Sequence, residues 1–401
     1  MWPRELQHII INKPIEVTLI QKIIFKTPSW QEILQQMLKD VFYLFYGGVT
    51  MLNIVACFYL LFRRGNAIAP DITSSVRLRR WTAAFFAVSA LSHLWNLPVF
   101  FLTSGDNVKL CYLVGALLDC MTIGPLALIL LITMLQDRRR PLWPVAVGVA
   151  PFVVVMAMCV ATRSDALLQV LYALFVVLAV AITVYMVRAL RQYGRWLRDN
   201  YADLEHKEVW QSFVVLAVIL SVLGIYTFDI EGLAYEYFIQ VINVVLIFYL
   251  LWRVETLSDL SIPANDAQEA VDTRSLSAEE HDHSLSMRNN IGPLLKQHCE
   301  ESRLYLQYDI SLTELAKQIG TNRVYLSQHF AMQGTTYNTY INNLRIKHFI
   351  SLCNEAAATH QPTTIQQLAY QSGFRSYGTF NTAFKQSMGM TATKWMRIQY
   401  R

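Results

Sequence analysis

The sequence predicts an all-α protein in two parts: a polytopic membrane helix bundle with seven transmembrane helices, and a smaller all-α C-terminal domain with two helix-turn-helix motifs. Three observations predict this fold class. The chain of 401 residues is 54% hydrophobic and only 16% charged, which is unusual for a soluble protein. Seven long apolar runs fill the region before residue 253. After residue 310, one pattern of helix caps and glycines occurs twice.

The first forty residues mix apolar and charged side chains and are predicted to form an N-terminal segment, residues 1–40, outside the cytoplasm. The apolar stretch Ile9–Ile11 is too short to span a membrane, and no small-residue cleavage site follows it. The sequence therefore predicts no removable signal peptide. An amphipathic helix is expected near residues 30–39.

The predicted transmembrane domain, residues 41–252, contains seven apolar runs. Each run is close to the roughly 20 residues that a helix needs to cross the hydrocarbon core. A core helix of a soluble protein rarely stays apolar over that length, so each run is predicted to be a span. The runs are residues 41–62, 81–102, 110–135, 142–162, 166–187, 209–228 and 233–252.

Basic residues are concentrated in alternate connections between the spans, and this asymmetry predicts their orientation. The second and fourth connections carry only Lys109 and Arg163, and the sixth carries none. The first, third and fifth connections carry Arg63, Arg64, Arg77, Arg79, Arg80, Arg138, Arg139, Arg140, Arg188, Arg191, Arg195, Arg198 and Lys207. We expect these three connections in the cytoplasm of a bacterium, with the N-terminus outside the inner membrane and the C-terminal domain inside.

One feature opposes this orientation. The exported N-terminal segment carries Arg4, Lys13, Lys22, Lys26 and Lys39, and basic residues close to a span normally oppose export. An unusual first span therefore stays an alternative.

The charge changes sign after the last span. Residues 253–283 contain two basic and eight acidic residues, a net charge of −6, and few large apolar residues. This composition predicts an acidic flexible linker, residues 253–285. Residues 284–401 contain 12 basic and five acidic residues, a net charge of +7. A basic terminal domain fits phosphate binding or an ordinary solvated surface.

The C-terminal domain, residues 286–401, carries the repeated motif. Thr364 and Gln367 have the spacing of a capping box, so a helix is predicted to begin at Ile365. Gly373 ends that helix and allows a tight turn, and Ser376 is expected to cap the next helix. Two short helices joined in this way form a helix-turn-helix pattern.

The same arrangement occurs about fifty residues earlier. Ser311 and Glu314 repeat the capping-box spacing, Gly320 repeats the turn, and Asn322 repeats the cap. Such an imperfect duplication is far more specific than a single helix-turn-helix match.

These residues resemble the DNA-binding domain of AraC-type bacterial transcription regulators. The resemblance rests on DISLTELAKQIGTNRVYLSQHF, on GTTYNTYINNLRIKHF, and on the second motif with Gly373-Phe374 and the sequence GMT from Gly389. The chain departs from the family at Ala392, where proline is usual, and this loosens the expected start of the last helix. The resemblance covers about a quarter of the chain.

The resemblance implies that the second helix of each motif enters the DNA major groove. By this resemblance the base-facing residues are Arg323, Val324, Ser327, Gln328, Arg375, Tyr377, Gly378, Asn381 and Thr382. Gln328 and Asn381 can pair with adenine, and Arg375 with guanine. A long helix over residues 336–352 is expected to hold the motifs about 34 Å apart, one DNA turn. Its Arg345 and Lys347 are candidates for phosphate contacts or for a solvated face.

Several polar residues lie within the predicted spans, where ionisable groups are costly and mark candidate sites. They are His93, Asn96, Asp119, Glu236, Gln240 and Asn243. The last three are spaced by four and three residues and so share a helix face. The set indicates either a signal pocket open to the outside or hydrogen bonds that hold the bundle together.

The sequence shows no motif for catalysis, for a metal site or for a cofactor, and its six cysteines are scattered. We therefore expect no enzyme but a membrane-bound, sequence-specific DNA-binding transcription regulator that responds to a signal sensed by the bundle. Its expected partners are double-stranded DNA, the lipid bilayer and a small-molecule or membrane signal, and a homodimer stays open. The alternatives are a transporter or membrane enzyme with a DNA-binding regulatory tail, and a passive membrane anchor for the DNA-binding domain.

Overall fold

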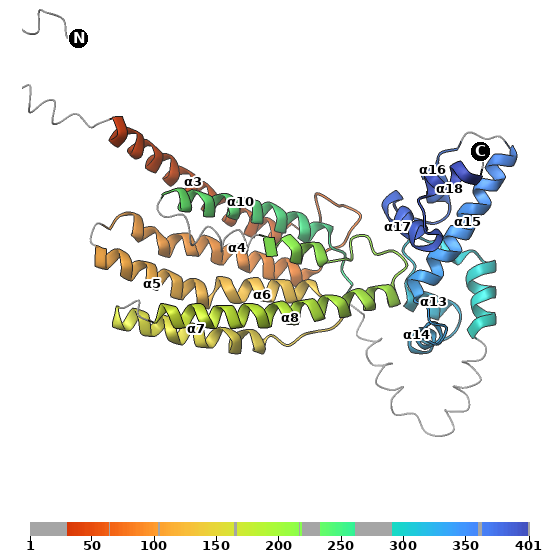
Figure 1. Ribbon diagram of the computed structural model, residues 1–401, viewed down its shortest axis with the longest axis horizontal. Coiled ribbons are helices and arrows are strands. Elements are labelled where there is room, and N and C mark those ends of the chain that lie inside the picture. Colours follow the sequence, from red (N-terminus) through yellow and green to blue (C-terminus); the bar gives the residue numbers. More distant parts are fainter. Residues whose placement is uncertain are drawn as a thin grey trace, which may run out of the picture.

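The computed structural model describes residues 30–63, 65–102, 105–163, 167–215, 217–218, 233–260, 291–359 and 363–399. Within these residues the chain is helical, with one isolated β-bridge and no strand. The helices form a long bundle and a separate C-terminal domain at one end of it (Figure 1). The predicted all-α fold class is therefore confirmed. Most of the predicted N-terminal segment and linker lies outside the described residues.

The bundle contains the long apolar helices. Among the described residues, six helical stretches are long and apolar enough to cross a membrane. Many of their large apolar side chains point outward, as a lipid-facing surface requires; Leu44, Phe58 and Val177 are examples. The helices are α3 (Trp30–Phe62), α4 (Val76–Asn96) with η1 (Leu97–Phe100), α5 (Gly105–Met121), α6 (Ile123–Met134), α7 (Trp143–Thr162), α8 (Leu168–Asn200) and α10 (Leu233–Thr256).

The seventh predicted span lies only partly within the described residues. We call the end of the bundle that faces the C-terminal domain the proximal end and the opposite end the distal end. Helices α8 and α10 both run from the distal to the proximal end (Figure 1). Residues 201–232 separate these two helices in the sequence. The apolar run 209–228 falls in that interval, but the structure describes it only as far as residue 218.

One predicted span is divided into two helices. The run 110–135 forms α5 and α6, and the backbone leaves the helical conformation at Thr122, where φ is −125°. Pro125 explains the break because it lacks the N–H that would bond to the carbonyl of Met121, and its ring clashes with that carbonyl. The two helices together still form one candidate span.

Two helices are longer than predicted. Helix α3 begins at Trp30 and joins the expected amphipathic helix to the first span. Helix α8 continues beyond residue 187 to Asn200. This α8 extension, residues 188–200, is held by a buried face of Ala189, Tyr193 and Leu197 at four-residue spacing.

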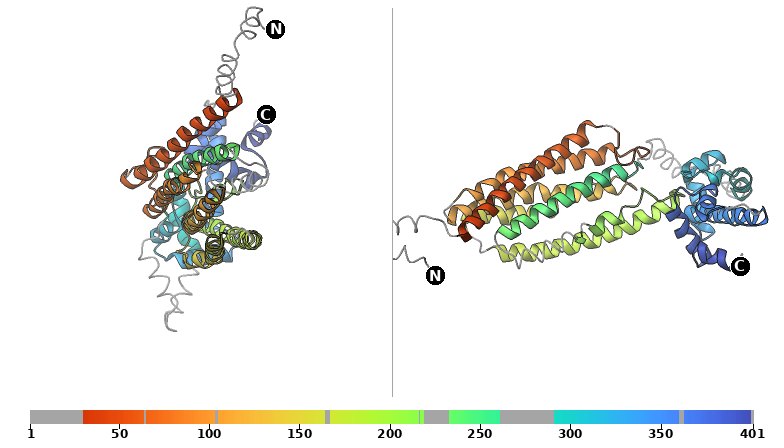
Figure 2. Two further views of the ribbon diagram at one scale, coloured as in Figure 1. Left: turned by 90° about the vertical axis from the view of Figure 1, so that its left-hand side faces the viewer. Right: turned by 90° about the horizontal axis from the view of Figure 1, so that it is seen from above.

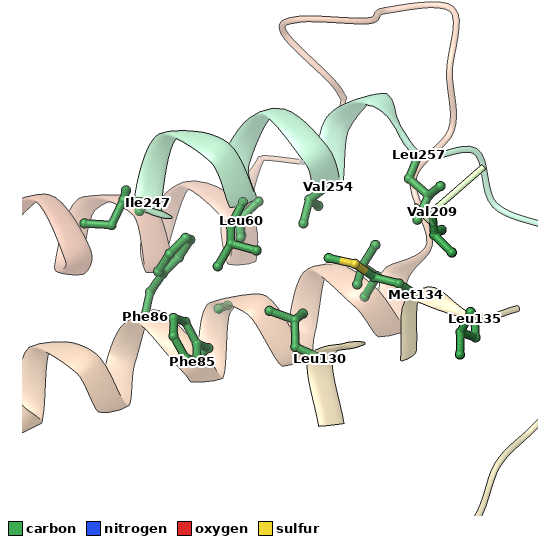
Figure 3. Close-up of a cluster of buried hydrophobic side chains, with 14 of the residues drawn as sticks. Leu60, Phe85, Phe86, Leu130, Met134, Leu135, Val209, Ile247, Val254 and Leu257 are labelled. Atoms are coloured by element: carbon green, nitrogen blue, oxygen red, sulfur yellow. The ribbon is translucent and has the colours of Figure 1, made fainter. Parts of the chain in front are cut away.

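The core of the bundle lies toward the proximal end. Side chains from α3, α4, α6 and α10 meet there with Val209, which follows the α8 extension (Figure 3). Phe86, Met134 and Val254 are at most 1% exposed in this cluster. The cluster therefore joins the last helix of the bundle to the segment that follows α8.

The C-terminal domain consists of two similar halves joined by a long helix. Each half has its own core, one built around Leu326 and Phe330 and the other around Phe380 and Phe384. The elements are η2 (Lys296–Glu301), η3 (Leu304–Leu306), α13 (Leu312–Gln318), α14 (Arg323–Met332), α15 (Tyr337–Thr359), α16 (Ile365–Gln371), α17 (Tyr377–Met388) and α18 (Ala392–Gln399).

The predicted capping interactions are present in both motifs. Ser311 with Glu314 and Thr364 with Gln367 form complete capping boxes. Gly320 and Gly373 have φ angles of +72° and +90°, the left-handed region that favours glycine. The joining helix α15 runs to Thr359, seven residues past the prediction.

Candidate nucleic-acid interface

The second helix of each motif is anchored in the domain by one face. Leu326 and Phe380 are fully buried beneath α14 and α17. Asn322 and Ser376 begin these helices, each accepting a hydrogen bond from the backbone N–H three residues on. The opposite faces carry the residues predicted to contact bases.

The α14 residues face the α8 extension. The Arg323 Nε donates a hydrogen bond of 2.8 Å to the Asn200 Oδ1. Val324, Ser327 and Gln328 line a cleft of about 640 Å³ whose other wall includes Trp196 and Asn200. The structure thus brings the four predicted residues of the first motif together on one surface.

The α17 residues divide between two surfaces. Gly378 and Thr382 line a cleft of about 480 Å³ with Glu205 and His206, which belong to the loop after α8. Tyr377 and Asn381 border a shallower hollow with Thr382, on the domain's own surface. The loop of residues 201–208 therefore lies against part of the predicted reading face.

The two predicted arginines share a third cleft. Arg323 and Arg375 both line a space of about 490 Å³. The Arg375 Nη1 lies 3.5 Å from the Asp309 Oδ2, and Lys207 Nζ lies 3.2 Å from the Asp309 Oδ1. Asp309 thus joins a predicted base contact of the second motif to the loop that follows α8.

Arg345 is neither a phosphate contact nor part of a solvated face. Its side chain is fully buried on α15 and donates to the carbonyls of Tyr305 (2.8 Å), Gln307 (2.7 Å) and Tyr308 (3.3 Å). Burial lowers the pKa of its guanidinium to about 10, so it stays charged at neutral pH. The sequence contained an indication that Arg345 is buried, because residues 341 and 349, four residues away on either side and so on the same helix face, are both apolar. Lys347 is exposed.

A comparison with protein families decides the nature of this domain. Residues 315–398 match a family model described as "Helix-turn-helix domain". The C-terminal part of the chain is a helix-turn-helix domain of the AraC type. The matched residues include α14, α15 and α17 entirely. Domains of this kind place the second helix of a motif in the DNA major groove.

The relatives of the helix-turn-helix domain are regulators. The TCP pilus virulence regulatory protein of Vibrio cholerae is 31% identical over 83 residues, 21% of this chain and 28% of that protein. An uncharacterized HTH-type transcriptional regulator of Staphylococcus aureus is 32% identical over 92 residues, 23% of this chain and 12% of that protein. The chain thus spans less than a third of either relative. No solved structure matches it.

The polar residues of the bundle form two networks toward its distal end. In the first, His93 Nε2 and Gln240 Oε1 are 2.9 Å apart, and the Tyr46 hydroxyl donates to the His93 carbonyl at 2.7 Å. His93 and Gln240 are both buried. This network joins α3, α4 and α10. Glu236 and Asn243 lie half-buried on α10 on either side of Gln240, and neither hydrogen-bonds to this network in the part of the chain described.

The second network surrounds the Asp119 carboxylate. It accepts hydrogen bonds from Ser92 (2.7 Å), Trp95 (3.1 Å) and Asn96 (3.3 Å), so it joins α4 to α5. Gly115 permits this contact, because a Cβ atom there would lie 2.1 Å from the Asn96 Oδ1. Sequence reasoning found Asn96 and Asp119 but missed Ser92 and Trp95. The four-residue spacing of Ser92 and Asn96 on one helix face was the available signal.

Proposed function

We propose that the chain is a membrane-bound transcription regulator that binds DNA through its helix-turn-helix domain and responds to a signal through its helix bundle. The single observation that carries this proposal is the presence in one chain of a matched helix-turn-helix domain and, among the described residues, of six helical stretches that could each cross a membrane. The regulatory names of the relatives support the DNA-binding part. The division into residues 41–252, 253–285 and 286–401 belongs to the same proposal.

The proposed location is the inner membrane of a bacterium, with the proximal end of the bundle in the cytoplasm. The arginine-rich connections support it, because Arg63 follows α3, Arg79 lies in the first turn of α4 and Arg140 follows α6, and these helix ends are at the proximal end (Figure 1). Two of these arginines are buried. Arg79 donates hydrogen bonds to the Arg63 carbonyl and the Asn66 side chain, and Arg140 pairs with Asp137. The start of α3 then lies on the outer side.

The proposed place of signal action is the pair of polar networks around His93 and Asp119. They connect four helices within the bundle, so a ligand or membrane change that alters them would shift those helices relative to one another. The rival idea of a passive anchor predicts no specific contact between the bundle and the DNA-binding domain. The bonds of Asn200 and Lys207 to that domain therefore favour coupling.

A genome-wide map of bound DNA tests the function. We expect the full chain to occupy discrete sites that share a sequence, and a chain that ends at residue 285 to occupy none. Gln328→Ala or Asn381→Ala should weaken binding to the preferred site by about 1–3 kcal/mol and relax the preference at one base position.

Lys347→Ala is the matched control for base reading. An exposed lysine that touches phosphate contributes equally to all sequences, so its loss should weaken binding without changing the preferred sequence. An unchanged preference in both amide variants would remove Gln328 and Asn381 from the base contacts. A map without discrete sites for the full chain would contradict the function itself.

A further inference from the structure

We infer that the α8 extension and the loop of residues 201–208 form an internal docking surface for the helix-turn-helix domain, and that docking keeps DNA off its reading face. The inference rests on the proposed DNA-binding function and adds how that function is controlled. In this view the observed arrangement is a closed state, in which the proximal end of the bundle covers the face of the domain that would otherwise bind DNA. Figures 1 and 2 show the end of α8 against the domain from different directions.

Backbone and side-chain contacts hold the first half of the domain to the loop. Tyr201 and Ser311 form an antiparallel β-bridge. The Asn338 side chain donates to the carbonyls of Tyr201 (3.1 Å) and Ala202 (2.6 Å). Ala202 is fully buried and belongs to the hydrophobic core of the first half of the domain. A residue of the loop thus completes a core of the domain, which chance proximity does not explain.

Polar contacts engage the reading residues themselves. Arg323 is bonded to Asn200, and Arg375 is paired with Asp309, which also binds Lys207. An arginine that reads guanine needs its guanidinium free for a bidentate contact. Arg323 is therefore held by the α8 extension itself, and Arg375 is linked to the loop through Asp309 of its own domain.

The loop and the α8 extension lie close beside the predicted reading residues of α14 and part of those of α17. The three clefts between the loop, the α8 extension and the domain measure about 480, 490 and 640 Å³. Such volumes suit a drug-sized molecule. A recognition helix instead needs a whole duplex beside it, with a major groove about 12 Å wide around the helix. In the closed state that we infer, the α8 extension and the loop therefore compete with a duplex for the space beside α14.

The docking surface is also tied to the last bundle helix. The His206 Nδ1 is 3.1 Å from the Thr256 carbonyl oxygen, and the Ser258 N–H donates to the His206 carbonyl at 2.9 Å. Movement of the end of α10 would therefore move the loop directly. This gives a signal a route to the domain besides the covalent connection through residues 261–290.

A disulfide lock tests the inference on the full chain in lipid nanodiscs. Facing residues of an antiparallel pair have Cα atoms about 4.5–5.5 Å apart, within the range that a disulfide bridges. We therefore expect the double variant Tyr201→Cys, Ser311→Cys to cross-link under mild oxidation. The probe is a random-sequence duplex of about 30 bp at low salt, where phosphate contacts alone give binding.

The oxidised form should lose binding to this duplex, and reduction should restore it. Equal binding by the oxidised and reduced forms would overturn the docking inference while leaving the function intact. Binding by neither form, nor by the unaltered chain, would overturn the DNA-binding function on which the inference rests.

A second variant opens the surface instead of locking it. Ala202→Arg places a large charged side chain at a fully buried position, so it should force the domain away from the loop. We expect about tenfold tighter binding of the same duplex, which corresponds to a closed state populated to about nine tenths. Gln192→Arg adds the same charge at an exposed position of the α8 extension and should leave affinity unchanged. Equal affinity of the two variants would contradict a closed state.

Discussion

Gly373 lies where the turn of the second motif meets the segment before α13. Its φ angle is +90°, and a Cβ atom at this position would lie 2.8 Å from the Leu306 Cα and 2.9 Å from the Leu306 carbonyl oxygen. Both neighbours are backbone atoms, which cannot rotate away as a side chain would. Gly320, its counterpart in the first motif, has φ +72° and open space around it.

This contrast predicts different costs for the same substitution. Gly320→Ala should lower the free energy of unfolding by about 1–2 kcal/mol, the strain of a left-handed alanine. Gly373→Ala should cost more, because the Leu306 backbone must also move. Pulse proteolysis of the purified full chain, followed with a C-terminal tag, measures both. Equal losses in the two variants would show that the close approach to Leu306 does not matter.

At the scale of the helices, the crossing of α4 and α5 depends on Gly115. A methyl group there would displace the Asn96 amide from Asp119 without removing any polar group. Gly115→Ala should therefore weaken the bundle by about 0.6–1.7 kcal/mol, the range of interhelical hydrogen bonds in membranes. Gly47→Ala on α3 is the control, because no atom lies within 4 Å of the added carbon.

Substitutions in the two polar networks distinguish a signal-sensing site from hydrogen bonds that only hold the bundle together. Membrane abundance, DNA occupancy and reporter transcription are measured for Gly115→Ala, His93→Ala and Asp119→Ala. Transcription that only follows abundance would leave the networks as structural bonds and end the signal-site proposal. Transcription fixed on or off at normal abundance would support it.

The starts of the short helices were predictable because their causes are local. Each capping box joins residues three apart, Ser311 with Glu314 and Thr364 with Gln367, and each turn glycine acts through its own backbone conformation. Spacing in the sequence is therefore enough to find these interactions. The break at Thr122 was equally local, since Pro125 is visible in the sequence, but the apolar run masked it.

The position of the reading face was not predictable, because its partners are distant in sequence. Arg323 meets Asn200, and Lys207 meets Asp309, across about a hundred residues or more. Such contacts depend on how two separately folded parts come together. Arg345 was misjudged for a related reason, since three carbonyls from a distant segment make its burial possible.

For the whole molecule, the topology that we propose puts the α6–α7 connection and the end of α10 on the same, cytoplasmic side of the membrane. Hydrogen bonds of Gln136 with Ser258 and Leu260 place the α6–α7 connection beside the end of α10. Reporters that work only in the cytoplasm should therefore be active when fused after Arg140 or Arg253. They should be inactive when fused after Asp106, in the first turn of α5, or after Asp229, which precedes α10 in the sequence. Activity after Asp106 would reverse the proposed orientation.

In the membrane orientation that we propose, the α8 extension also sets a height above the bilayer. From residue 188 to Asn200 it adds thirteen helical residues beyond the apolar run, a length of about 20 Å at 1.5 Å per residue. Inner-leaflet lipids that carry negative charge repel DNA, but this repulsion decays over a Debye length of about 8 Å at physiological salt. A domain released near the tip of this helix would meet DNA more than two Debye lengths from the headgroups. In the proposed orientation the extension is therefore a spacer that lets a polyanion approach a charged bilayer.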